Sequence, residues 1–134
     1  MAFRTHAVDY FYITVDTAPG EGYRQLAELG VNLVAITAIP FGPARTQLTV
    51  FPQNTSALLE AADRSGLAVD GPHPAILVQG DDEVGALAVI HDKLRDVSVT
   101  PYASTGVADG RGGYGYIIYV HPDEHAMAMA ALRS

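Results

Sequence analysis

The order of predicted strands and helices occurs twice along the chain, and this repeat restricts the possible folds more than any other sequence feature. Residues 8–16 are β-branched and aromatic, which is typical of a buried strand, and residues 22–29 place apolar side chains at helical spacing. Further strands over residues 31–39 and 47–51, and a helix from about residue 55 to 64, complete the first pattern. That pattern is strand, helix, strand, strand, helix.

A break separates the two patterns. Leu67–Val69 is predicted to be a short strand, and Asp70-Gly71-Pro72-His73-Pro74 is predicted to be a linker, because two prolines and a glycine continue neither a helix nor a strand. We therefore expect one unit over residues 1–71 and a second over residues 72–134.

The second unit repeats the order of elements. They are predicted over residues 75–78, 83–95, 97–107, 114–120 and 123–133. Asp82 is the expected N-cap of the first of its helices. Val31-Asn32-Leu33 aligns with Val97-Ser98-Val99, and Leu48–Pro52 aligns with Ile118–Pro122. A repeat as long as one of these units indicates a domain duplication and not a solenoid.

The first unit resembles the start of an ACT domain. Asp16-Thr17-Ala18-Pro19-Gly20, a short helix and the run Leu29-Gly30-Val31-Asn32-Leu33 match a layout in which a Pro-Gly turn follows the first strand and a glycine-led run opens the second. The second unit keeps the layout, with Gly80 in its first turn and Ser98 at the start of its second strand. The resemblance implies an α+β, ferredoxin-like sandwich of two tandem ACT-like βαββα units, with antiparallel sheets packed side by side and helices on one face.

The resemblance also implies a ligand-binding site. ACT units bind a small polar metabolite, often an amino acid, at the interface between units, with contacts from the first turn and from the start of the second strand. The implied contact residues are Thr17, Ala18, Pro19, Gly20, Val31, Asn32, Gly80 and Ser98. A glycine turn at a helix N-terminus leaves backbone N–H groups that attract a carboxylate, and an amide such as that of Asn32 offers a donor and an acceptor. We expect the first turn to hold the ligand and the second unit to supply a wall.

Composition restricts the partners. The net charge is −7 with a single lysine, Lys93, which argues against a nucleic-acid interface and against an anionic membrane surface. The chain has no cysteine, its N-terminus lacks an apolar signal segment, and no apolar run is long enough to span a bilayer. We expect a cytoplasmic regulatory or sensor protein without enzymatic activity, cofactor or metal. Its expected partners are a small-molecule ligand and a second copy in a homodimer, or an enzyme on which it docks.

Two motifs resemble signatures of other chemistry. His121-Pro122-Asp123-Glu124-His125 has the order of an inverted zinc-protease motif, but Pro122 is expected to start a helix and leave His121 at its cap. Gly110–Gly115 spells G-x-G-x-x-G but precedes a strand, so a hairpin loop is predicted, with Arg111 available to an anionic ligand as a lesser alternative. The alternative function is a small metal-dependent enzyme on a paired βαβββ scaffold that resembles the vicinal-oxygen-chelate class.

The second unit ends after its last helix and so lacks a fourth strand. Its sheet would expose unpaired N–H and C=O groups at one edge. We expect Phe3–Ala7, or a strand of a second chain, to cover that edge.

Overall fold

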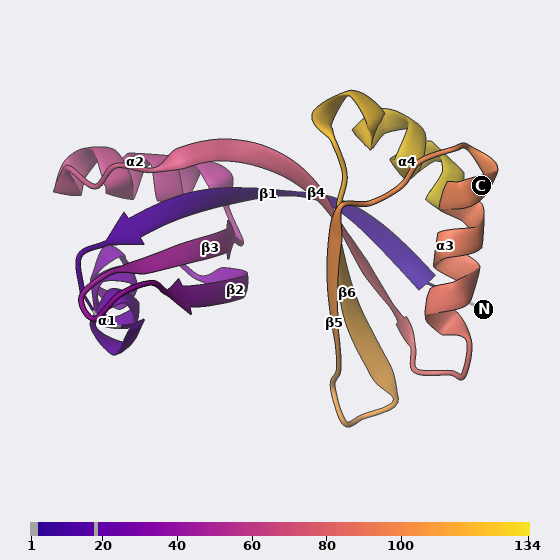
Figure 1. The fold of residues 1–134 in the computed structure, drawn as a ribbon, viewed down its shortest axis with the longest axis horizontal. Helices are drawn as coiled ribbons and strands as arrows, with labels where there is room; N and C mark the ends of the chain where they lie inside the picture. Colours follow the sequence, from indigo (N-terminus) through magenta and orange to yellow (C-terminus); the bar gives the residue numbers. More distant parts are fainter. Residues whose placement is uncertain (1–2, 18) are drawn as a thin grey trace. The chain divides into compact units, whose positions relative to one another are not determined.

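A computed structural model describes residues 3–17 and 19–134. The elements in chain order are β1 (Phe3–Val15), α1 (Pro19–Leu29), β2 (Leu33–Pro40), β3 (Thr46–Pro52), α2 (Thr55–Ser65), β4 (Asp70–Asp81), α3 (Ala86–Asp96), β5 (Ala103–Ala108), β6 (Gly113–Tyr119), the 3-10 turn η1 (Pro122–Glu124) and α4 (His125–Arg133) (Figure 1). The order strand, helix, strand, strand, helix occurs twice, so the predicted α+β class is confirmed.

The chain forms two compact units. Asp9–His73 make one, called here the N-terminal unit, and residues 3–8 with Pro74–Ser134 make the other, called the C-terminal unit. Strands β1 and β4 each contribute to both units, because each is long enough to pass from one to the other.

The N-terminal unit is built on antiparallel strands in the order β2-β3-β1. Its core joins side chains from these strands to α1 and α2: Phe11, Ile13, Val15, Leu26, Leu48, Val50 and Leu58. Local signals set the ends of α2. The Asn54 side chain accepts a hydrogen bond from the Ala57 N–H at 3.0 Å, and Gly66 ends the helix at φ 72°.

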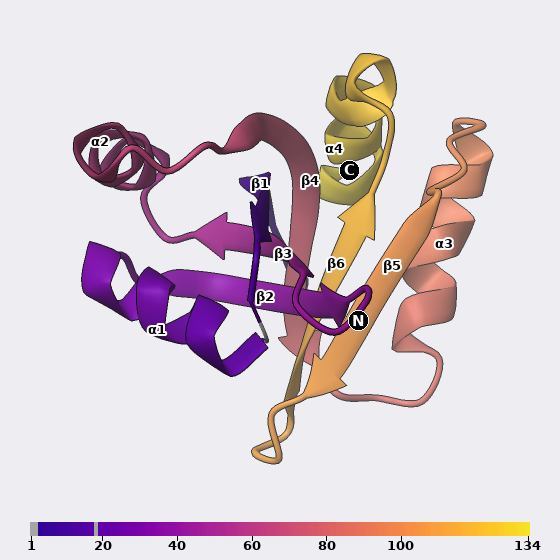
Figure 2. The same ribbon diagram turned by 60° about the vertical axis from the view of Figure 1, so that its left-hand side comes forward.

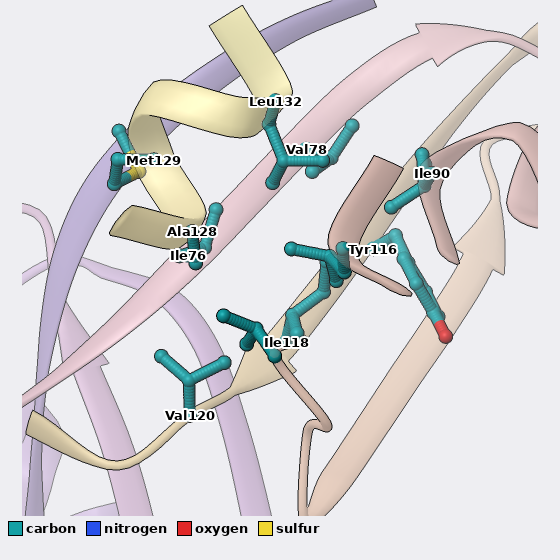
Figure 3. Packing of buried hydrophobic residues seen from close by; sticks show 11 residues of the cluster. Ile76, Val78, Ile90, Tyr116, Ile118, Val120, Ala128, Met129 and Leu132 are labelled. Atoms are coloured by element: carbon teal, nitrogen blue, oxygen red, sulfur yellow. The ribbon is translucent and has the colours of Figure 1, made fainter. Parts of the chain in front are cut away.

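The C-terminal unit has the strand order β4-β6-β5, with β1 beside β4 on the other side. Helices α3 and α4 contact each other over one face of this sheet (Figures 1 and 2). The core between sheet and helices contains Ile76, Val78, Ile90, Leu94, Val99, Tyr116, Ile118, Val120, Ala128, Met129 and Leu132 (Figure 3).

The start of β1 belongs to the C-terminal unit, as predicted for Phe3–Ala7. Phe3 packs against the core of that unit, and β1 is the neighbour of β4 in the sheet. The chain's own first strand therefore takes the edge position that the sequence left open.

Two predictions around residue 70 are wrong. Leu67–Val69 is not a strand, because Gly66 ends α2 and the Leu67 N–H bonds back to the Ala62 carbonyl at 3.0 Å. The expected linker Asp70–Pro74 lies within β4. The pairing of β4 with β6 begins only at Ile76, so the prolines lie where one side of the strand needs no N–H donor.

The start of α3 also differs from the prediction. The helix begins at Ala86 with Gly85 as its N-cap, and Asp82 does not cap it. The N–H of Asp82 donates to the Gly112 carbonyl at 2.9 Å, so Asp82 extends the pairing of β4 and β6. The predicted extended stretch over residues 97–107 becomes a strand only from Ala103. Among the described residues, no helix has both the length and the apolar composition to cross a membrane.

Candidate functional site

The predicted ligand-binding turn of the N-terminal unit is hydrogen bonded to another part of the same unit. The Thr17 carbonyl accepts a hydrogen bond from the fully buried Thr46 hydroxyl at 2.8 Å. Pro19 and Gly20 are the first residues of α1, so the expectation of a separate turn before a helix at Gly22 is wrong. The predicted contact Ala18 lies outside the described residues.

Val31 and Asn32 lie away from this turn. Val31 packs against the core of the unit, and the exposed Asn32 accepts the Gln53 N–H at its carbonyl at 2.8 Å. Thr46 begins β3 and Gln53 follows its end, so Thr17 and Asn32 lie at opposite ends of a strand about 20 Å long. Within the N-terminal unit, the predicted ligand contacts of the turn therefore lie far from those at the start of the second strand.

The predicted contacts of the C-terminal unit are also apart. Gly80 lies in β4 opposite Tyr114 and lines a hollow of about 360 Å³ that Arg4 and Arg111 also line. Ser98 follows α3 at φ 60°, and its N–H donates to the Arg95 carbonyl at 2.9 Å. Gly80 precedes α3 and Ser98 follows it, so the length of the helix separates them. Ligand contact at any residue of the predicted set stays a prediction.

A cleft opens where the C-terminal unit passes from β4 to α3. It has a volume of about 450 Å³ and is named here the α3–β5 cleft. One wall is the turn and the first residues of α3, which include Asp82, Glu83, Gly85, Leu87 and Ala88. The opposite wall is Gly106, Val107 and Ala108 of β5, with Tyr114 and Gly115 of β6.

The α3 wall presents unsatisfied backbone donors. No side chain caps the helix at Gly85, and the Ala86 N–H bonds to the Glu83 carbonyl at 3.1 Å. Within the part of the chain that the structure describes, the N–H groups of Leu87 and Ala88 have no acceptor. Free N–H groups and the helix dipole both favour a negative charge at this point.

The mouth of the cleft is acidic and its sides are apolar. Asp82 and Glu83 supply carboxylates, while Leu87 and Val107 are 43% and 72% exposed. Burial, and then the charges of Asp81 and Glu83, raise the pKa of Tyr114 above 10.0. Its hydroxyl therefore stays protonated at neutral pH and can donate a hydrogen bond.

A series of side-chain hydrogen bonds joins the elements that form the two walls. Tyr116 in β6 donates its hydroxyl proton to Ser104 Oγ of β5 at 2.8 Å, and the same oxygen lies 2.7 Å from His91 Nε2 of α3. Figure 3 shows the Tyr116 ring extending from β6 with its hydroxyl outermost. These two hydrogen bonds link α3 to β5 through the side chain of Tyr116 in β6.

Sequence reasoning missed this cleft, although one signal was present. Asp81, Asp82 and Glu83 form an acidic run between a strand and a helix, at the position that Pro19 and Gly20 hold in the first pattern. Asp82 also fits a helix N-cap by its sequence position, so the acidic run does not by itself indicate a ligand contact.

The two histidines of the H-x-x-E-H sequence have separate contacts. The exposed His121 lies against the Tyr102 ring, with 5.2 Å between ring centroids, and His125 Nε2 donates to the Ala75 carbonyl at 3.0 Å. Among the described residues, no three His, Asp or Glu side chains gather as ligands for a metal ion.

Comparison with known proteins gives structural matches. No protein family matches the sequence, and no curated protein matches it. A protein of Bacteroides thetaiotaomicron of known structure superposes with a TM-score of 0.77 at 15% identity, over 96% of this chain and 88% of that one. The ligand-free regulatory subunit of aspartate kinase from Thermus thermophilus gives 0.60 at 14% identity, over 99% and 95%.

The corresponding regulatory subunit from Thermus flavus gives 0.56 at 15% identity, over 98% of this chain and 94% of that one. The fold is ACT-like. This confirms the ferredoxin-like α+β fold that the sequence predicts.

Proposed function

We propose that the chain is a regulatory protein that binds a small zwitterionic metabolite, of the amino-acid class, in the α3–β5 cleft. The observation that supports this most directly is the composition of the cleft. It has free helix N–H groups, two carboxylates and an apolar wall within about 450 Å³. That volume lies within the range of about 300–1,000 Å³ usual for small-molecule sites.

Each part of an amino acid has a counterpart in the cleft. Its carboxylate accepts hydrogen bonds from the N–H groups of Leu87 and Ala88, and its ammonium group lies near Asp82 and Glu83. Its side chain packs against Leu87 and Val107, whose apolar surface is exposed without a ligand. Hydrogen bonds to charged groups contribute roughly 1.5–3 kcal/mol each, so these contacts favour a zwitterion over a neutral molecule.

The fold supports the regulatory part of the proposal. This chain covers almost the whole of the Thermus thermophilus regulatory subunit, and that protein is named as part of an aspartate kinase. By analogy, the chain changes the activity of an enzyme on which it docks, or its own assembly, when ligand binds. The homodimer and the cytoplasmic location predicted from the sequence are part of this proposal, and light scattering of the purified protein tests the dimer.

A binding screen tests the ligand class. Each of the common amino acids is added to the purified protein, and the unfolding temperature is measured. A ligand present at 100 times its Kd stabilises the fold by about 2.7 kcal/mol. Absence of any stabilisation by amino acids at millimolar concentration would contradict the proposed class.

Variants test the location of the site. Glu83→Gln and Asp82→Asn should weaken binding of the amino acid that the screen identifies, because each removes a charge near the ammonium group. Glu60→Gln on α2 is the matched control, since Glu60 is an exposed acid of the N-terminal unit. Equal weakening by all three changes would place the effect in overall charge and not in the cleft. Stoichiometric zinc, iron or manganese in protein purified without added metal would favour the enzyme alternative instead.

A further inference from the structure

Three cationic side chains line a second hollow of the C-terminal unit. The chain has eight Lys and Arg residues, and Arg24, Arg45 and Arg95 form ion pairs with acids. Arg4, Lys93 and Arg133 have no carboxylate side chain as a partner among the described residues, and all three line one hollow of about 420 Å³, named here the basic hollow. The other residues that line it are Phe3, Thr5, Leu132 and Ser134.

Contacts within the chain hold two of these cations in place. Arg133 donates from Nε to Thr5 Oγ1 at 3.2 Å and from Nη2 to the Thr5 carbonyl at 3.4 Å. Lys93 Nζ donates to an oxygen of Ser134, the last residue of the sequence, at 2.9 Å. These bonds use some of the donors of each cation and leave others for a ligand, because a guanidinium has five N–H groups and an ammonium has three. Ordering of both side chains before binding lowers the entropic cost of binding.

The charge distribution points to an anion. The protein has a net charge of −7, yet no Asp or Glu side chain of the described residues lines the basic hollow. A terminal carboxylate at Ser134 offsets the charge of Lys93, so Arg4 and Arg133 carry most of the positive charge that is open to a ligand. The cations come from β1, α3 and α4, so they approach the hollow from three elements and do not spread over a flat surface.

We propose that the basic hollow binds a phosphate group, either free phosphate or the terminal phosphate of a metabolite. A phosphate ester carries between −1.5 and −2 charges at about pH 7, and its oxygens accept the paired N–H groups of a guanidinium. Two guanidinium groups and an ammonium group around one hollow offer several N–H donors to the oxygens of a phosphate. The site is independent of the α3–β5 cleft, since no residue lines both. Helix α3 contributes to both, with Leu87 near its start and Lys93 near its end.

Two phosphate probes test the proposal. Inorganic phosphate and glycerol 3-phosphate are titrated into the full chain at constant ionic strength, with chloride as the reference anion, and amide chemical shifts are followed by NMR. Saturable shifts of residues around Thr5, Lys93 and Arg133 with either probe support the site. Binding of both probes identifies the shared phosphate group as the ligand, and binding of the ester alone identifies a phosphorylated metabolite. Shifts no larger than those with chloride would overturn the proposal.

Three variants locate the site. Arg133→Gln and Lys93→Gln should each weaken the affinity about tenfold, the expected effect of losing one charge-assisted hydrogen bond. Arg64→Gln is the matched control, because Arg64 is a cation of the N-terminal unit without an ion pair among the described residues. Arg133→Lys keeps the charge and should weaken binding less than Arg133→Gln, which separates loss of charge from loss of folding. Equal affinity in Arg133→Gln and Arg64→Gln would reject the basic hollow as the site.

Discussion

The two units have the same order of elements but differ where the first strand of each meets its helix. In the N-terminal unit, Asp16 pairs with Arg45 at 3.3 Å and the Thr17 carbonyl accepts the Thr46 hydroxyl, so side chains at the start of β3 bind the turn. In the C-terminal unit, no ion pair holds Asp82 or Glu83 among the described residues, and a cleft opens beside them. One topology thus gives an internally bonded turn in one unit and an accessible turn in the other.

A second difference concerns one glycine of each unit that allows two elements to lie close together. Under α1, a Cβ added at Gly22 would lie 3.2 Å from Val15 Cγ2 and 3.4 Å from Leu48 Cδ1, so the helix lies close to the sheet there. In the C-terminal unit the tight contact is under the outer strand β5, where a Cβ at Gly106 would lie 2.8 Å from Tyr116 Cδ1. The first of these contacts lies between a helix and the sheet, and the second lies between two neighbouring strands.

The largest expected effect comes from removing one core side chain in each unit. Leu48 and Ile118 are fully buried, each in the core of its own unit. Leu48→Ala and Ile118→Ala should each lower the free energy of unfolding by about 2–5 kcal/mol, because they lose buried area and leave a cavity. Hydrogen exchange measured residue by residue should show the larger loss of protection in the unit that carries the substitution. An equal loss in both units would show that the two cores unfold together and would remove the basis for comparing them.

The glycine positions give the next largest effect. Gly106→Ala should cost about 1–3 kcal/mol, because Tyr116 is buried and hydrogen bonded at its hydroxyl and cannot move away from the new methyl group. Gly22→Ala should cost less, because its contact is looser and alanine favours the helix by about 1 kcal/mol over glycine. Chemical denaturation measures both.

Gly115→Ala serves as the control, since a Cβ at Gly115 meets nothing within 4 Å. If Gly22→Ala proved the more damaging of the first two changes, the tighter of these two contacts would have been assigned to the wrong glycine.

Local signals explain most of what the sequence predicts about the fold. Asn54 caps α2 and Gly66 ends it, and both roles depend on neighbours within a few residues. Asp82 looked like a cap by the same criteria, but its N–H bonds to Gly112, which is distant in sequence. The local sequence determines which residue caps a helix only when no neighbouring strand binds the backbone N–H group of that residue.

The candidate site was harder to predict for the same reason. The predicted turn at Thr17 has the residue types of a ligand-binding turn, but its carbonyl bonds to Thr46 across the unit. The α3–β5 cleft joins an acidic run to a strand about 20 residues further on, which no local pattern connects. In contrast, the place of Phe3 was predictable, because an unpaired sheet edge requires a strand and the N-terminal segment was available.

A smaller effect is expected from the bond that closes the turn of the N-terminal unit. Thr46→Val keeps the shape of the side chain but removes the hydroxyl that donates to the Thr17 carbonyl. The loss should be about 1 kcal/mol, the usual contribution of one hydrogen bond, as measured by urea denaturation.

The matched control is Thr49→Val. Thr49 lies on the same strand, and its hydroxyl has no hydrogen bond among the described residues. The closed character of this turn would be in doubt if both substitutions had the same effect.

The smallest expected effect is a dependence of the free energy of unfolding on pH, which arises beside the acidic turn of the C-terminal unit. Burial, followed by the charges of Asp81 and Glu83, raises the pKa of Tyr114 above the 10.0 of a free tyrosine. The unfolded chain therefore loses this proton at a lower pH than the folded chain. The stabilisation is complete below about pH 10 and is lost as the pH rises through the pKa of the folded state.

Unfolding by urea at about pH 8 and about pH 11 should show a steeper decline in stability for the unmodified chain than for Tyr114→Phe, which lacks the ionisable group. Tyr23, which is 44% exposed on α1, is the matched residue of the N-terminal unit, and Tyr23→Phe should decline as the unmodified chain does. A decline that Tyr114→Phe leaves unchanged would mean that the acids beside α3 do not act on the cleft wall. Their proposed attraction for a ligand ammonium group would then lose its electrostatic support.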